Sequence, residues 1–148
     1  MLDYTNYICL MENLIPVISK LSQFISQMEE SAKEQFNLSS LTFSQMHYLE
    51  TINLLINPNI TELAAAMKLS KPTVKVGIDK LIERDYVFKV QSDEDRRSAH
   101  IHLTEKGKLI NLMHDYAHKR IAESITKKLD DNEQKILIKL LNTVFPEK

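Results

Sequence analysis

The sequence has few residues that end helices or form disulfides. Its 148 residues include two glycines, four prolines, no tryptophan and one cysteine, Cys9. Because turns draw heavily on glycine and proline, this low content predicts a mainly helical chain. A single cysteine cannot form an internal disulfide, which excludes the disulfide-rich secreted class and favours a reducing compartment. The length fits one domain, or one domain with dimerisation helices attached.

Charge and hydropathy exclude two further classes. The formal net charge of −1 excludes a globally basic nucleic-acid-binding protein, so any contact with DNA must come from a local patch. We find no stretch with the apolar length needed to span a membrane, and the N-terminus lacks the pattern of a signal peptide. We therefore expect a soluble, cytoplasmic protein with no membrane partner.

The two ends of the chain have the pattern of long helices that pair with a second subunit. Apolar residues recur with a period near 3.5 over residues 4–36, and a small domain cannot cover so long a stripe by itself. The segment after residue 104 also predicts helices. We expect residues 1–36 and 105–148 to be the dimerisation helices of a homodimer.

Residues 37–104 have the order of elements of a winged helix-turn-helix domain. The predicted elements are helices over residues 42–55, 62–68 and 71–84, followed by strands over residues 87–91 and 99–103. Thr61 is the expected N-cap of the short helix, and Ser70 caps the helix after the turn. Eight residues are expected to pack inside: Leu63, Ala64, Met67, Leu69, Val74, Ile78, Leu81 and Ile82. The two strands form a hairpin, with His100 and His102 on its exposed side.

The outward face of the helix over residues 71–84 is polar and basic. Its candidate DNA-contacting residues are Ser70, Lys71, Thr73, Lys75, Val76 and Lys80. Residues 68–97 hold eight basic and six acidic residues, a net charge of +2 against −3 for the rest. Such side chains contact base edges and phosphates in the major groove, and Arg96 and Arg97 at the hairpin tip can reach the minor groove. Gly77 would allow a close backbone approach.

The sequence resembles the MarR family over nearly its whole length. The matching pieces are residues 41–45, 62–64, 69–70, 74–81, 95–97 and 103–107. The most specific of them is Asp-x-Arg in the wing followed by Leu-Thr-x-x-Gly. The resemblance implies a mainly α winged helix-turn-helix transcriptional regulator, not an enzyme, that represses genes by binding an inverted-repeat operator as a homodimer.

The resemblance also implies roles for two wing residues and shows two departures. Arg97 would be the wing arginine, and Asp95 would hold it in place by an ion pair. Lys75 stands where the family usually has threonine, and Asp85 where it usually has glycine. The fold assignment tolerates these changes, but the operator sequence does not transfer.

Four residues match the metal site of the zinc-sensing AdcR and ZitR branch of the family. His114 and His118 are four residues apart, so they share a helix face. The match implies zinc binding by Glu29, His47, His114 and His118, a sensible donor set for tetrahedral Zn²⁺. The second site of that branch is not matched. Histidines packed at the dimer interface are the other interpretation.

The effector therefore stays open at the level of sequence. A pocket for a small aromatic or acyl ligand between the wing domain and the dimer helices is one alternative. Its expected lining is Phe43, Met46, Tyr48, Met113 and Tyr116.

Three other hypotheses belong to different classes. A helical interaction protein that has lost DNA binding is favoured by four acidic residues: Asp79, Glu83, Asp93 and Glu94. The segment from His114 to His118 resembles the His-Glu-x-x-His motif of zinc peptidases, but Asp115 replaces the glutamate that acts as general base. Cys9 lies too far from the Thr-x-x-Gln segment to match the redox cysteine of OhrR-type members.

Overall fold

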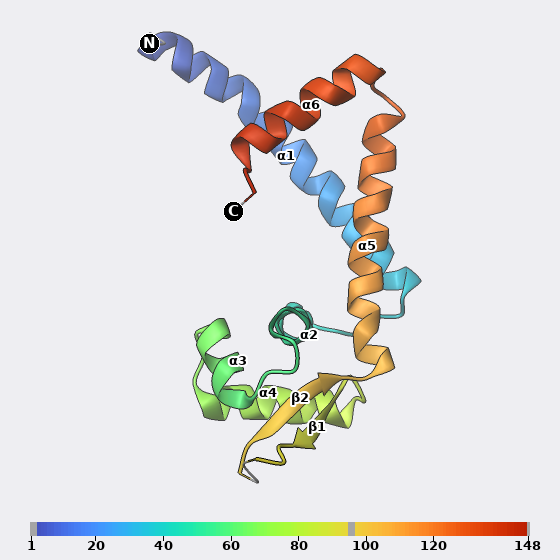
Figure 1. Ribbon diagram of the computed structural model, residues 1–148. Coiled ribbons are helices and arrows are strands. Elements are labelled where there is room, and N and C mark those ends of the chain that lie inside the picture. The colour runs from blue at the N-terminus through green and yellow to red at the C-terminus, as the bar shows by residue number, and fades with distance from the viewer. Residues whose placement is uncertain (1–2, 95–96, 148) are drawn as a thin grey trace. The chain divides into compact units, whose positions relative to one another are not determined.

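The computed structural model describes residues 3–94 and 97–147. Within these ranges the chain forms helices and one antiparallel hairpin (Figure 1). The elements are α1 (Tyr4–Gln35), α2 (Phe43–Leu55), α3 (Ile60–Met67), α4 (Lys71–Glu83), β1 (Val87–Gln91), β2 (Ala99–Leu103), α5 (Glu105–Thr126) and α6 (Asp131–Val144). The mainly helical class, the helix-turn-helix and the two-stranded wing are confirmed.

The chain packs as two compact units. One comprises residues 1–31 and 115–148, and the other comprises residues 32–114. The boundaries of the two units fall inside α1 and α5.

In the first unit, α1 carries a long apolar surface on its outside. Ten large apolar side chains of α1 are exposed: Tyr4, Tyr7, Ile8, Leu10, Met11, Leu14, Ile15, Val17, Ile18 and Leu21. By length and composition α1 could also cross a membrane, with a mean hydropathy of 1.3 over its most apolar window. The statement that no stretch has this length was therefore wrong. The apolar residues of α1 are interrupted by Glu12, Lys20 and several Asn, Ser and Gln residues, which hide the apolar stretch from a search for unbroken apolar sequence.

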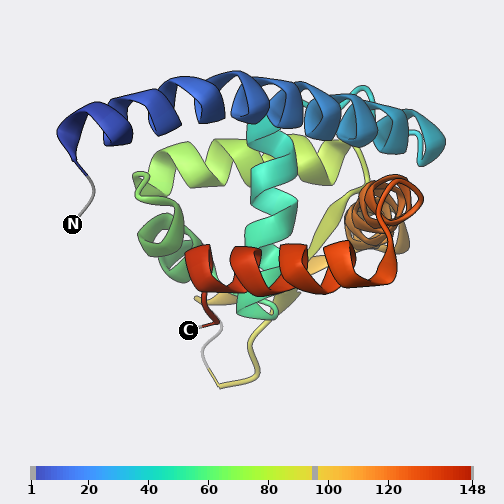
Figure 2. The same ribbon diagram turned by 90° about the horizontal axis from the view of Figure 1, so that it is seen from above.

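The second unit is built around the crossing of α2 and α4, which Figure 2 shows from above. Leu63, Ala64, Val74, Ile78 and Leu81 are buried as expected, and Met67 and Ile82 are half-buried. Leu69 is 39% exposed, contrary to expectation. The reason is that Lys68 ends α3 in the left-handed conformation, with φ 55°, so that Leu69 lies in the turn rather than on an inner helix face.

Side chains fix where these helices begin. Thr42 and Gln45 form a capping box at the start of α2, and Ser70 accepts a hydrogen bond from the backbone N–H of Thr73 at the start of α4. α3 begins two residues earlier than expected, because its N-cap is Asn59 and not Thr61. Asn59 Oδ1 accepts from the N–H of Glu62, and the Glu62 carboxylate accepts from the N–H of Asn59, both at 2.8 Å.

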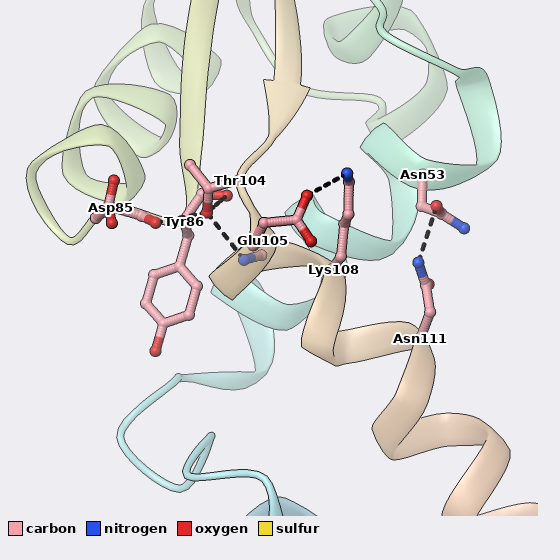
Figure 3. Close-up of polar contacts among 8 residues, drawn as sticks. Asn53, Asp85, Tyr86, Thr104, Glu105, Lys108 and Asn111 are labelled. Carbon is pink, nitrogen blue, oxygen red and sulfur yellow. Dashed lines mark hydrogen bonds and ion pairs between the residues drawn. The ribbon is translucent and has the colours of Figure 1, made fainter.

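The end of the wing is joined to α5 by the Leu-Thr-x-x-Gly segment. The hydroxyl of Thr104 donates toward the carbonyl oxygen of Asp85 at 2.6 Å and accepts from the N–H of Gly107 at 3.0 Å (Figure 3). A Cβ at Gly107 would lie 2.1 Å from the carbonyl oxygen of Tyr86. Only glycine allows α5 to start this close to the backbone of Tyr86, the residue before β1, which gives this family signature a structural reason.

Candidate nucleic-acid interface

The outward face of α4 is open, as the sequence predicts. Five of its candidate side chains, Lys71, Thr73, Lys75, Val76 and Lys80, are exposed, and so is Ser70 at the cap. Ser70 and Thr73 also contact each other, with their hydroxyl oxygens 2.7 Å apart. The face therefore combines a rigid first turn with three lysines on flexible stems.

The structure brings Lys75 and Arg97 to the same place. Both line a hollow of about 400 Å³ on the second unit, together with Lys89 of β1 and Thr61. Lys75 and Arg97 around one small hollow favour an anion such as a backbone phosphate, whereas Lys89 is paired with Asp79. Arg97 makes a further interaction within the chain. Asp95 and Arg96 lie outside the described residues, so the predicted ion pair of Asp95 and the reach of Arg96 stay predictions.

Lys89, which the sequence analysis did not name, pairs with Asp79, one of the acidic residues that favoured the loss of DNA binding. Its Nζ lies 3.1 Å from Oδ1 of Asp79, with both side chains partly exposed. The ion pair joins α4 to β1 and neutralises an acidic residue of α4. Asp79 therefore does not argue against a nucleic-acid interface.

Arg84 does not belong to this face. Its Nη1 donates to Oε1 of Gln45 at 2.8 Å, and its Nη2 donates to the Ser40 hydroxyl at 2.7 Å. Since Gln45 Oε1 also accepts from the N–H of Thr42, Arg84 ties the end of α4 to the capping box of α2. Its guanidinium lies 5.4 Å from the centre of the Tyr86 ring, which adds a cation–π contact.

Two positions noted in the sequence, Asp85 and Gly77, have local explanations. Asp85, where the family usually has glycine, has φ 62°, so this position does require the left-handed conformation. Gly77 faces the interior: a Cβ there would lie 2.7–2.8 Å from the Tyr48 ring. The close approach is therefore made by Tyr48 and not by DNA, which corrects the expected role of Gly77. Burial raises the pKa of Tyr48.

The histidines predicted to bind metal are divided between the two units. His47 and His114 belong to the second unit and Glu29 and His118 to the first. Within the second unit, Nε2 of His114 lies 2.8 Å from Oε1 of Glu50, and Nδ1 of His47 lies 3.9 Å from Oε2 of the same carboxylate. Glu50, which the sequence analysis missed, is therefore the partner of both imidazoles. In residues 3–94 and 97–147 no group of three or more His, Cys, Asp or Glu is arranged to hold a metal ion.

The residues named as the lining of an organic-ligand pocket and the two histidines of the wing lie as follows. Met46, Tyr48 and Met113 are core residues, whereas Phe43 is 86% exposed. His100 and His102 are not on a fully exposed strand face. Nδ1 of His100 lies 3.0 Å from the carbonyl oxygen of Asn57, and the ring of His102 stacks on Phe88 at 5.3 Å between centroids.

The arrangement of α3, α4 and the hairpin defines the winged helix-turn-helix class. Residues 41–99 match the MarR family. The HTH-type transcriptional regulator PchR of Bacillus subtilis is 27% identical over 126 residues, which cover 83% of this chain and 73% of PchR. The uncharacterized HTH-type transcriptional regulator YhjH of Bacillus subtilis is 26% identical over 105 residues, 70% of this chain and 60% of YhjH.

Solved structures give the same fold over most of the chain. The structure of Streptococcus pneumoniae FabT in complex with DNA has a TM-score of 0.64 at 23% identity and covers 94% of both chains. RV1404 of Mycobacterium tuberculosis has a TM-score of 0.77 at 16% identity and covers 90% of this chain and 91% of its own. The central part of the chain is therefore similar to the MarR family, and the solved structures show the same fold over most of its length.

Proposed function

We propose that this protein is a homodimeric transcriptional repressor that binds an inverted-repeat operator, with α4 in the major groove and the wing beside it. The observation that carries the proposal is the joining of Lys75 and Arg97 at one hollow beside the exposed face of α4. Lys75 would meet base edges or phosphates, and Arg97 would meet the backbone or the adjacent minor groove. Relatives named as regulators, and FabT solved with DNA, support this assignment. Such a regulator works in the cytoplasm.

The apolar outside of the first unit supports the homodimer. α6 exposes a second set of apolar side chains: Ile136, Ile138, Leu140, Leu141, Val144 and Phe145. Exposed apolar surface on this scale marks a surface that a partner covers. A two-fold dimer would place two copies of α4 on two half-sites, which is why we propose an inverted repeat. The same covering explains why α1 is apolar enough to resemble a membrane helix.

The test is binding of the protein to the DNA upstream of its own gene, measured by fluorescence anisotropy. The variant Lys75→Ala with Arg97→Ala should weaken binding at least about tenfold, because it removes two charged contacts. Lys127→Ala and Lys135→Ala, in the other unit, remove two lysines far along the chain and should leave affinity within about twofold. Unchanged affinity in the first variant would contradict the proposal. If the wild type does not bind this DNA, the result would favour a helical interaction protein that has lost DNA binding.

Zinc as the effector stays a prediction. The contact between Glu50 and His114 adds a third variant to its test. Zinc on Nε2 of His114 would have to displace the Glu50 carboxylate or accept it as a ligand. Chelator competition should show tight zinc binding to the wild type that is lost in His114→Ala and in His118→Ala. Glu50→Gln should change zinc affinity if the carboxylate competes or coordinates. Weak zinc binding whose affinity is the same in the wild type and in all three variants would leave an organic effector as the better hypothesis.

A further inference from the structure

Val76 lies on the side of α4 opposite to the core, although it is apolar and β-branched. Val74, Ile78 and Leu81 are 0% exposed and mark the side of α4 that faces the core. Because successive residues of an α-helix are about 100° apart around its axis, Val76 lies about 160° from both Val74 and Ile78. Its side chain is 55% exposed. Val76 therefore occupies the line of α4 that would enter a DNA groove deepest.

Val76 is part of a short apolar strip with basic residues on both sides. Pro72 is also exposed and lies one helical turn earlier. Four residues rise about 6 Å along a helix, which is close to two base-pair steps of roughly 3.4 Å. Lys75 and Lys80 are exposed, and helical spacing places them on either side of the strip. The outward face of α4 thus has an apolar centre between cationic edges.

Helix stability does not favour valine at such a position. A β-branched side chain has one preferred χ1 rotamer in a helix, which lowers its helix propensity below that of alanine or lysine. With 55% of its surface exposed, Val76 recovers only part of this cost by packing. A single exposed apolar residue is nevertheless common on protein surfaces. The inference therefore depends on which bases the rest of α4 can recognise.

The polar residues of α4 leave few ways to recognise an A·T pair. Residues Lys71–Glu83 include no asparagine or glutamine, the side chains that form paired hydrogen bonds with adenine, and no arginine. The hydroxyl oxygen of Thr73 lies 2.7 Å from that of Ser70, so these two groups already contact each other. The lysines can meet guanine or phosphates. An apolar contact is the remaining direct way for α4 to recognise an A·T pair.

The major groove presents one apolar group to such a side chain. Thymine carries a 5-methyl group at the groove surface, and no other base of unmodified DNA has one. A contact between this methyl group and the two methyl groups of Val76 removes apolar surface from water on both sides. The contact distinguishes thymine from cytosine without a hydrogen bond.

We propose that Val76 is a specificity-determining residue that recognises the 5-methyl group of a thymine in each operator half-site. Pro72 would cover the neighbouring base step on the same strip. The inference rests on the proposed DNA-binding function and adds to it the kind of base that α4 recognises.

The probe is a DNA duplex that the full-length wild type selects from a pool with a random central segment. Each thymine of the selected duplex is then replaced singly by deoxyuridine, which removes the 5-methyl group and keeps the base pair. Fluorescence anisotropy measures the affinity. At one thymine or two neighbouring thymines of each half-site, the replacement should weaken binding about fourfold, as expected for one buried methyl group.

Variants of Val76 show which side chain contacts the methyl group. Val76→Ala should weaken binding to the thymine duplex about fourfold and bind the thymine and deoxyuridine duplexes equally, which is the coupling expected of a direct contact. Val76→Ile should keep the preference for thymine. Val90→Ala is the matched control, because Val90 is 41% exposed and alternates with Lys89 on β1, so it lies on the other face of the hairpin. It should keep both the affinity, within about twofold, and the preference.

Nuclear Overhauser contacts between the thymine methyl group and the methyl groups of Val76, in the wild-type complex, provide a readout that needs no variant. A selected duplex that binds equally after every replacement would overturn the role of Val76 and leave the proposed function intact. An undiminished preference for thymine in Val76→Ala would do the same. If the wild type selects no sequence from the pool, the proposed function has failed, and the role of Val76 fails with it.

Discussion

Gly107 shows how one residue fixes the junction between the wing and α5. The atom that a new Cβ would meet, 2.1 Å away, is a backbone oxygen of Tyr86 and cannot rotate aside. We expect Gly107→Ala to lower the free energy of unfolding by about 3 kcal/mol or more, above the usual cost of overpacking. Urea denaturation measures it. A loss below about 1 kcal/mol would mean that α5 can move away from β1.

Gly77 makes a milder demand, because its neighbour is a side chain. Alanine gains about 1 kcal/mol in helix propensity but collides with the buried Tyr48 ring, at a cost of about 1–3 kcal/mol. Gly77→Ala should therefore be neutral or destabilising in the wild type and stabilising in a Tyr48→Ala background. Thermal unfolding of the four proteins of this cycle tests the contact. An equal effect in both backgrounds would show that Tyr48 does not matter.

Tyr48 also predicts a pH effect on stability. Burial raises the pKa of its hydroxyl in the folded state above the ordinary value of about 10. Above about pH 10 the unfolded chain therefore releases this proton first, and stability falls as pH rises; below that value the contribution is complete. Tyr48→Phe should lose less stability than the wild type between pH 9 and about pH 11, measured by urea denaturation. Parallel curves would contradict this.

At the scale of elements, the start of α3 is where sequence and structure differ most clearly. Asn59 and Thr61 are both good N-caps, and the sequence pattern alone does not choose between them. The choice is made by the wing: the carbonyl oxygen of Pro58 accepts from the N–H of Ile101, and Asn59 forms a bridge with His100. This contact between distant segments holds Asn59 in the extended conformation that a cap requires.

The two candidate caps can be compared directly. Asn59→Ala should lower the free energy of unfolding by about 1 kcal/mol, since it leaves the N–H of Glu62 without its acceptor. Thr61→Ala, an exposed position inside the first turn, should change it by less than about 0.5 kcal/mol. Chemical denaturation of both variants decides the matter. The reverse order would restore Thr61 as the cap.

Most other elements could be predicted from the sequence, because local signals determine them. Both strands lie at the predicted residues, and the predicted cap at Ser70 is confirmed. The candidate site was predicted only in part. The basic face of α4 follows from helical spacing, whereas the Lys89–Asp79 and His114–Glu50 pairs join segments that no local pattern relates.

For the whole molecule, the exposed apolar side chains of α1 predict the oligomeric state. Ile15 is 60% exposed, and glutamate in its place would bring a charge into the proposed interface. Ile15→Glu should shift the protein from dimer to monomer at micromolar concentration in sedimentation velocity. Leu54→Glu, an equally drastic change at a 79% exposed position on α2, is the control and should remain dimeric. A dimeric Ile15→Glu protein would place the interface elsewhere.

The engagement of Arg84 and Lys89 affects how the protein would respond to ions. Arg84 donates hydrogen bonds to Gln45 and Ser40, and Lys89 forms an ion pair with Asp79. The positive electrostatic potential that attracts DNA is therefore weaker than the number of basic residues suggests. Counterion release contributes about 0.9 to the logarithmic slope for each neutralised phosphate. With these two cations already engaged, the proposed operator complex would release fewer counterions than the basic residues of the domain suggest. Its occupancy would then change less when the cell's potassium concentration rises or falls.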